Sequence, residues 1–302
     1  MPTARPHRGP ARADWAMLLV VVIWGGNLPV IKAALAQVPL LAFAGVRFAI
    51  ASALFVPLLL AREGSILPPA GTGWAMLWLG LLGNTGYQLL FMTGLFHTSV
   101  ANTALILACT PVLVAAFGAV SGIERLTRSV AAGVILAVAG VALVLGHEGA
   151  RITPQTLAGD LPVLAAAACW ALYTLGVQRH AASMSPLRIT TLTMLTGTPG
   201  LVLAGLPAIL RTDWSAVSAA AWGGILYSAL LALLVAYTLW NRSVAEVGPS
   251  RTAVYNCLVP VVALTLAWAA LGERPGALQV AGAALIVGGV LVARAIPARR
   301  TA

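Results

Sequence analysis

Polar and aromatic side chains occur inside long apolar runs of the chain, where they suit recognition of a small molecule. In the run from Trp15 to Ala36, Trp24 and Asn27 lie close to the middle. A side-chain amide is costly to bury in hydrocarbon without a partner, so Asn27 must face protein groups or water. Pro29 cannot donate a backbone hydrogen bond and loosens the helix around it, which exposes backbone groups for a ligand or serves packing alone.

Lys32 follows in the same run and admits two interpretations. Its long apolar stem allows the ammonium group to reach the lipid headgroups. Alternatively, the charge attracts the carboxylate of a substrate inside a wet cavity. Both interpretations stay open, and Lys32 belongs to the candidate binding residues.

Other apolar runs carry polar residues on one helix face. Tyr87 and Gln88 come one helical turn after Asn84, so the three can share a face that looks into a helix bundle. Trp240 and Trp268 are candidates for the wall of a cavity. The complete set of candidate substrate-binding residues is Trp24, Asn27, Lys32, Asn84, Tyr87, Gln88, Asn102, Trp170, Tyr173, Tyr237, Tyr255 and Asn256.

Carboxylates are confined to tails, loops and the ends of the apolar runs. The acidic residues are Asp14, Glu63, Glu124, Glu148, Asp160, Asp213, Glu246 and Glu273. Proton-driven antiport commonly uses an intramembrane carboxylate, so we expect facilitated diffusion or exchange instead. The three cysteines lie in apolar runs, and no Cys or His has a partner at metal-ligand spacing. We therefore expect no metal, no cofactor and no enzymatic activity.

The elements that must position these residues are membrane-spanning helices. Hydrophobic residues make up 60% of the chain and charged residues 9%, which excludes a soluble domain. The net charge of +10 comes from scattered residues, so nucleic acid is not an expected partner. Ten runs have the length of a bilayer span, at roughly 15–36, 40–61, 74–96, 100–121, 130–146, 160–179, 187–209, 219–241, 250–270 and 278–294.

Basic residues are distributed unequally between the two sides of this topology. Thirteen of the 18 Lys and Arg residues fall on the side of the termini, three fall on the other side, and Lys32 and Arg47 lie within spans. Cytoplasmic loops carry the excess of positive charge. The sequence therefore predicts a multi-pass protein of the bacterial inner (plasma) membrane with both termini cytoplasmic.

A stretch that occurs twice sets the architecture. Residues 94–144 and 243–293 align without a gap, so that Pro111 corresponds to Pro260. Proline bends a helix, and Pro29, Pro111 and Pro260 are candidate hinges or gates, with packing as the alternative. Each copy closes a unit of five spans, and an odd number of spans inverts the second unit relative to the first.

The two units also match in their first and last spans. Trp24 corresponds to Trp170, and Asn27 to Tyr173. Small residues recur at a seven-residue spacing in the fifth and tenth spans, which allows close helix approach. These glycines, to which we assign a structural role, are Gly133, Gly140, Gly282 and Gly289.

Four segments carry a family resemblance that covers roughly residues 14–295. "IERLTRSVAAGVILAVAGVALVL" and "LGERPGALQVAGAALIVGGVLVA" resemble the ends of the two halves of an EamA-type transporter of the drug/metabolite transporter superfamily, and "WGGNLPVIKAAL" and "FAGVRFAIA" resemble its first two helices. The chain is also similar to bacterial exporters of aromatic and other neutral amino acids. The resemblance implies that Arg47 is a structural motif residue that pairs with backbone carbonyls. It also implies that the last helices of the halves pack together outside the substrate cavity.

The predicted fold is an all-α integral membrane protein with ten transmembrane helices, arranged as two inverted five-helix repeats around a central cavity. The expected segments are a disordered cytoplasmic tail (1–13), the first repeat (14–146), an extracytoplasmic linker (147–159), the second repeat (160–295) and a cytoplasmic tail (296–302). We expect a monomer that contacts the bilayer and a small-molecule substrate.

The predicted function is export of amino acids and related small metabolites by alternating access. A carrier of phosphorylated solutes or nucleotide sugars is the alternative, but it would need more cations in the cavity than Lys32 and Arg47. An exporter of cationic drugs would need a buried carboxylate. A membrane-embedded enzyme or receptor is the alternative from another class.

Overall fold

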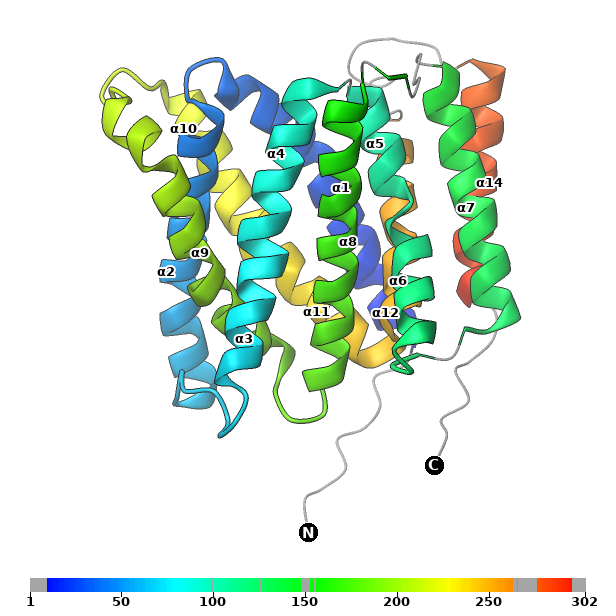
Figure 1. The fold of residues 1–302 in the computed structure, drawn as a ribbon, viewed down its shortest axis with the longest axis horizontal. Helices are drawn as coiled ribbons and strands as arrows, with labels where there is room; N and C mark the ends of the chain where they lie inside the picture. The colour runs from blue at the N-terminus through cyan, green and yellow to red at the C-terminus, as the bar shows by residue number, and fades with distance from the viewer. Residues whose placement is uncertain are drawn as a thin grey trace.

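The computed structural model describes residues 10–98, 100–124, 126–147, 153–154, 156–262, 265 and 276–294. These residues form helices and short connections, and the helices stand side by side in one bundle (Figure 1). A helix satisfies its backbone N–H and C=O groups internally, which a segment surrounded by lipid requires.

The first half provides five helical spans. Three are continuous: α1 (Pro10–Leu35), α2 (Leu40–Glu63) and α7 (Arg128–His147). The third span is made of α3 (Gly73–Gly80), the π-helical η1 (Leu81–Gly86) and α4 (Tyr87–His97). The fourth span is made of α5 (Val100–Ala108) and α6 (Thr110–Val120), which meet at Cys109, directly before the predicted bend at Pro111.

The second half repeats this order. Its continuous helices are α8 (Leu157–His180), α9 (Pro186–Arg211) and α14 (Ala277–Arg294). The eighth span is made of α10 (Ala219–Tyr227), the π-helical η2 (Ser228–Val235) and α11 (Ala236–Val247). The ninth begins with α12 (Pro249–Ala253) and the 3-10 helix η3 (Val254–Leu258), and is described as helix through Val262.

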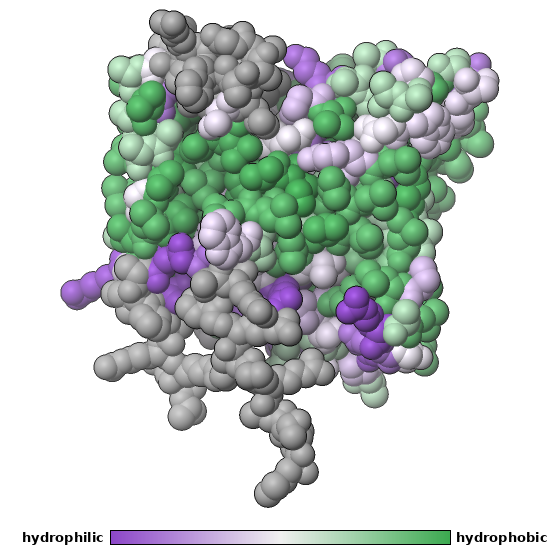
Figure 2. All heavy atoms as spheres, turned by 180° about the vertical axis from the view of Figure 1, so that it is seen from behind, coloured by the Kyte–Doolittle hydropathy of each residue, from purple (hydrophilic) through white to green (hydrophobic). Residues whose placement is uncertain are grey.

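Within the described residues, 8 helices are long and apolar enough to cross a membrane. The other two predicted spans are the third, which carries several polar residues, and the ninth, of which only a part is described. Figure 2 shows apolar side chains gathered in a band across the middle of the bundle, with hydrophilic residues towards both ends. This surface fits a multi-pass membrane protein, whose lipid-facing side chains are apolar.

Two helices begin earlier than the sequence pattern predicts. α1 begins at Pro10, so residues 10–13 are helical although we expected them in a disordered tail, and α8 begins at Leu157, inside the expected linker. Proline is favoured in a first helical turn, where its missing N–H has no acceptor anyway. The described residues do not include 1–9 of the expected N-terminal tail, 148–152 and 155 of the expected linker, Trp268, Glu273 or the tail 296–302.

The last helices of the two halves, α7 and α14, pack against each other in opposite directions. A Cβ atom placed on Gly133 would lie 2.5 Å from the carbonyl oxygen of Gly289, and one on Gly140 would lie 2.5 Å from that of Gly282. The glycines therefore allow backbone-to-backbone contact. Because the partner position falls from 289 to 282 as the chain advances from 133 to 140, equivalent helices run antiparallel and the second half is inverted.

The third span of each half contains a π-helical stretch. These stretches, η1 and η2, occupy equivalent places in the two repeats, and both lie in the middle of their spans. A π-helical turn widens the helix by one residue and is frequent at functional sites. The repeated irregularity directs attention to the side chains around η1 and η2.

Candidate functional site

Six aromatic side chains gather in the interior of the bundle, and we call them the aromatic cluster. Trp170 on α8 lies at its centre, with ring centroids of its neighbours between 5.2 and 6.0 Å away. Trp170 is 5% exposed, so it is closed to solvent from both ends of the bundle. The members of the aromatic cluster are Trp24, Tyr87, Trp170, Tyr173, Tyr237 and Trp240.

Each half of the chain holds part of the aromatic cluster in place. Trp24 donates from Nε1 to the backbone oxygen of Ala232 in η2, at 3.1 Å. The hydroxyl of Tyr173 accepts a hydrogen bond from Nδ2 of Asn241 at 2.8 Å. Gly83 in η1 leaves room for Tyr173, since a Cβ atom there would lie 2.3 Å from its ring. The π-helical stretches therefore position aromatic rings of the opposite half.

Two of the predicted amides connect these π-helical stretches to the other half. Asn27 on α1 accepts a hydrogen bond from Ser228 in η2 at 2.6 Å. Asn84 in η1 donates from Nδ2 to the backbone oxygen of Thr193 on α9 at 2.8 Å, and its Oδ1 atom is buried without a partner. Asn84 thus retains an unused acceptor beside the aromatic cluster.

Arg47 on α2 is buried at 6% exposure. Its Nη2 atom donates to Oε1 of Gln88 at 3.2 Å, and its guanidinium carbon lies 5.2 Å from the ring centre of Phe43. The recorded partner is a side-chain amide, whereas the family resemblance led us to expect backbone carbonyls. Gln88 follows Tyr87 on α4, so this contact places the charge at the edge of the aromatic cluster.

The remaining predicted binding residues lie elsewhere. Lys32 is exposed near the end of α1, and Asn256 is half-buried in η3. Asn102 lies at the beginning of α5, where it contacts Asp160, and Tyr255 contacts Asp14. The sequence pattern therefore identified five members of the aromatic cluster as binding candidates and Trp240 as a cavity-wall candidate, but it also selected residues near the helix ends.

Asn102 and Tyr255 belong to two aspartate contacts that sequence reasoning missed. Asp160, in the first turn of α8, accepts hydrogen bonds from Thr98 at 2.6 Å and from Asn102 at 3.2 Å. We call this the Asp160 latch. The signal was available, because Asp14 and Asp160 correspond by the same repeat offset as Trp24 and Trp170.

Asp14, the repeat equivalent of Asp160, contacts different positions of the opposite half. It accepts a hydrogen bond from the hydroxyl of Tyr255 at 2.5 Å and forms an ion pair with Arg294. We call this the Asp14 latch. Since α1 and α8 begin at opposite ends of the bundle, the two latches lie at opposite ends (Figure 1).

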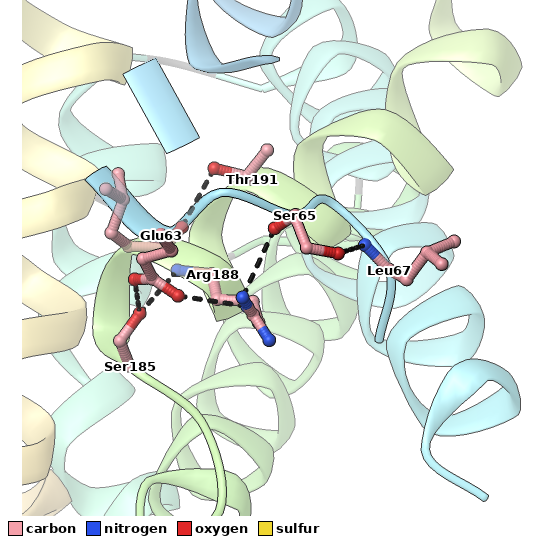
Figure 3. A network of polar contacts seen from close by, with 7 residues as sticks. Glu63, Ser65, Leu67, Ser185, Arg188 and Thr191 are labelled. Atoms are coloured by element: carbon pink, nitrogen blue, oxygen red, sulfur yellow. Dashed lines mark hydrogen bonds and ion pairs between the residues drawn. The ribbon is translucent and has the colours of Figure 1, made fainter. Parts of the chain in front are cut away.

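Further polar contacts join the halves at the end of the bundle that carries Asp14. Figure 3 shows Glu63 at the end of α2 beside Arg188 and Ser185 at the start of α9, with Arg188 Nε 3.0 Å from the carboxylate. Glu124 accepts a hydrogen bond from the backbone N–H of Ser250 at 3.0 Å. Burial raises the pKa of the Glu124 carboxyl above its ordinary value, although the hydrogen bonds from Ser250 act in the opposite direction.

A cavity of about 700 Å³ lies between the α1–α2 and α9–α10 connections, where Gln37, Arg211 and Asp213 help to line it. It lies at the end of the bundle opposite Asp14, and its lining does not include the aromatic cluster. In the described part of the chain, no group of His, Cys, Asp and Glu side chains could hold a metal ion.

Comparison with known proteins gives consistent matches over the whole bundle. The EamA-like transporter family model matches residues 11–146 and 157–295. The chain is 32% identical to the uncharacterized transporter YyaM of Bacillus subtilis (strain 168), over 83% of each chain. It is 30% identical to the "Probable terminal-alkyne amino-acid exporter" of Streptantibioticus cattleyicolor, over 93% of each chain.

Two further comparisons agree with these matches. A "Probable amino-acid metabolite efflux pump" of Salmonella typhimurium is 29% identical, over 91% of this chain and 92% of that protein. One crystal structure superposes with a TM-score of 0.81 at 22% identity, covering 96% of this chain and 99% of that chain. At this identity the structural match supports the fold alone.

Proposed function

The chain belongs to the EamA-like transporter family, and from this membership we propose that it exports amino acids, chiefly aromatic and other neutral ones. The observation that carries the proposal is the aromatic cluster, which both halves of the bundle build together. Secondary transporters with inverted repeats bind their substrates near the bilayer midplane, between the repeats. Both halves contribute rings to the aromatic cluster in the interior of the bundle, which supports the cluster as the binding site.

The chemistry of the aromatic cluster suits an amino acid. Indole and phenol rings offer stacking surfaces to an aromatic side chain and apolar contact to an aliphatic one. A substrate ammonium group is attracted to the face of such rings. Two relatives are named for export of amino acids or their metabolites, which supports this substrate class and this direction.

Binding requires the aromatic rings to separate. The rings pack against one another at centroid distances of 5.2 to 6.2 Å, with the latches closed at both ends. Alternating access would release one latch while the other holds, so that the substrate reaches the cluster from one side at a time. Inverted repeats make the two motions equivalent.

We further propose facilitated diffusion or exchange without proton coupling. The described carboxylates lie at the ends of the helices, and none lies beside the aromatic cluster. Export that does not respond to an imposed pH gradient supports this proposal. Proton flux in fixed ratio to amino-acid flux contradicts it.

The transport proposal is tested with purified protein in proteoliposomes. Vesicles loaded with unlabelled phenylalanine should accumulate labelled phenylalanine transiently by counterflow, and protein-free vesicles should not. A panel that includes leucine, tryptophan, a sugar phosphate and a nucleotide sugar separates the alternatives. Counterflow of the phosphorylated compounds without that of any amino acid contradicts the proposal.

We also propose a monomer in the bacterial inner membrane with both termini cytoplasmic. The end of the bundle that carries Asp14 also carries most of the basic residues, which supports a cytoplasmic position for it. Protease access to an added N-terminal tag in inside-out vesicles, and not in intact spheroplasts, checks this orientation.

A further inference from the structure

Arg47 carries a positive charge in the interior of the bundle without a carboxylate beside it. The described acidic residues pair or hydrogen-bond near the helix ends, Asp14 with Arg294, for example. Glu63, on the same helix as Arg47, lies about 24 Å away along the axis at 1.5 Å per residue. Within the described chain, no ion pair of Arg47 is recorded.

The groups around Arg47 leave most of its hydrogen-bonding capacity unused. A guanidinium group has five N–H donors in a planar fork. The recorded hydrogen bond goes from Nη2 to the amide oxygen of Gln88, and Nε is buried without a partner. The rings of Phe43 and Phe48 provide weaker attraction at 5.2 and 5.5 Å.

Burying a charged group that has no ion-pair partner costs free energy. Removing an ion from water without pairing it costs far more than cation–π contacts return, so intramembrane charges normally pair or mark a binding pathway. A neutral side chain of similar size would pack at this place at lower cost. The unused N–H donors of the Arg47 guanidinium group therefore indicate that an anion completes the site.

The position of Arg47 identifies what kind of anion fits. Gln88, which accepts the hydrogen bond from Arg47, directly follows Tyr87, a member of the aromatic cluster, on α4. A ligand held between Arg47 and the cluster must combine an anionic group with an apolar body. Guanidinium matches a carboxylate through two parallel hydrogen bonds.

We infer that Arg47 is the carboxylate-binding residue of this transporter, and that it takes the α-carboxylate while the aromatic cluster takes the side chain. This inference rests on the proposed function, since it assigns one part of the same substrate. It replaces the structural role that the family resemblance implied for Arg47. It also distinguishes Arg47 from Lys32, which is exposed and apart from the cluster.

The inference is tested by comparing 3-phenylpropionate with its neutral amide, 3-phenylpropanamide, which has the same shape. Binding to the purified protein is followed by the change in its tryptophan fluorescence, to which the three tryptophans of the aromatic cluster contribute. The wild-type protein should bind the carboxylate about tenfold more tightly, and Arg47→Gln should bind both equally. Arg47→Lys should keep part of the preference, because ammonium retains the charge but not the fork.

Arg62→Gln is the matched control, because Arg62 lies exposed on the same helix and should leave the preference unchanged. A second measurement does not depend on folding of the variants. Phenylglyoxal labelling of Arg47, located by mass spectrometry, should slow in the presence of the carboxylate and not of the amide. Equal protection by both ligands, or an undiminished carboxylate preference in Arg47→Gln, overturns the inference.

Counterflow separates this inference from the proposed function. If the wild-type protein transports no amino acid but binds 3-phenylpropionate through Arg47, the proposed function fails and the inference stands. If the protein transports phenylalanine and Arg47→Gln transports it equally well, the inference fails and the function stands.

Discussion

Trp24 and Trp170 occupy equivalent positions in the two repeats and meet edge to face, with ring centroids 6.0 Å apart. Trp170→Ala is expected to reduce transport of phenylalanine about tenfold, because it removes the ring surface that Trp170 offers to the substrate. Such an aromatic contact contributes about 0.5–1.5 kcal/mol. Initial rates of counterflow measure the effect. Trp78→Ala, at an exposed position, serves as the control, and an equal loss in both variants contradicts a role of the cluster in binding.

The two latches are expected to control opposite ends of the bundle. Asp160→Ala removes hydrogen bonds to a charged group, each worth about 1.5–3 kcal/mol, and should favour opening at the Asp160 end. Asp14→Ala should favour opening at the other end. Labelling of a single cysteine introduced at Tyr237, which is 4% exposed within the aromatic cluster, by an impermeant maleimide measures the access from each side in a protein without the native cysteines.

These two substitutions control for each other. Asp160→Ala should accelerate labelling from the Asp160 side and slow it from the Asp14 side, and Asp14→Ala should do the reverse. Faster labelling from both sides in either variant would indicate general loosening of the bundle and contradict the latch model.

Neighbouring glycines of α14 are expected to respond differently to one added methyl group. A Cβ atom on Gly289 would lie 2.6 Å from the backbone oxygen of Gly133, whereas one on Gly288 meets nothing within 4 Å. Gly289→Ala should lower the free energy of unfolding by about 1–3 kcal/mol through overpacking. Gly288→Ala should be neutral or slightly stabilising, since alanine favours the helix. Unfolding of the purified variants in SDS compares them, and equal stability contradicts the close approach of α7 and α14.

Glu124 is expected to make stability depend on pH. Its folded-state pKa lies above the ordinary value, so between the two values the folded protein binds more protons than the unfolded chain. The free energy of unfolding therefore falls as pH rises through that interval. Glu124→Gln removes this contribution, so the variant should gain stability relative to the wild type above the interval and match it below.

Thermal unfolding between about pH 4 and pH 8 measures this difference, a range that begins near the ordinary carboxyl pKa. Glu246→Gln is the control, because Glu246 is an exposed carboxylate paired with Arg242. A wild-type advantage that grows with rising pH contradicts the predicted sign.

The architecture of two inverted repeats could be predicted from the sequence, because the repeated residues align at a constant offset. The repeat matched Gly133 and Gly140 with glycines of the second half and Trp24 with Trp170, and the family resemblance implied that the last helices of the two halves pack together. Hydropathy also located most spans, because lipid tolerates few polar residues. Boundaries were less certain, as the start of α1 at Pro10 shows.

The arrangement of the site was harder to predict. Asn102 and Tyr255 were selected as polar residues near apolar runs, but each contacts an aspartate at a helix end. Asp14 and Asp160 were assigned to tails and span ends, since sequence alone does not reveal that two helix ends meet. The π-helical stretches share no pattern in composition, because η1 contains Gly and Asn whereas η2 consists of Ser, Ala, Leu and Val.

The interface between α7 and α14 bears on how the two repeats arose. Gly133 faces Gly289, the duplicate of Gly140, and Gly140 faces Gly282, the duplicate of Gly133. A two-fold dimer has an isologous interface of this kind, in which one surface patch serves both subunits. Two copies of a single ancestral half, inserted into the membrane in opposite orientations, would already have formed this interface. Joining two such halves in one chain would then fix this pairing of α7 with α14.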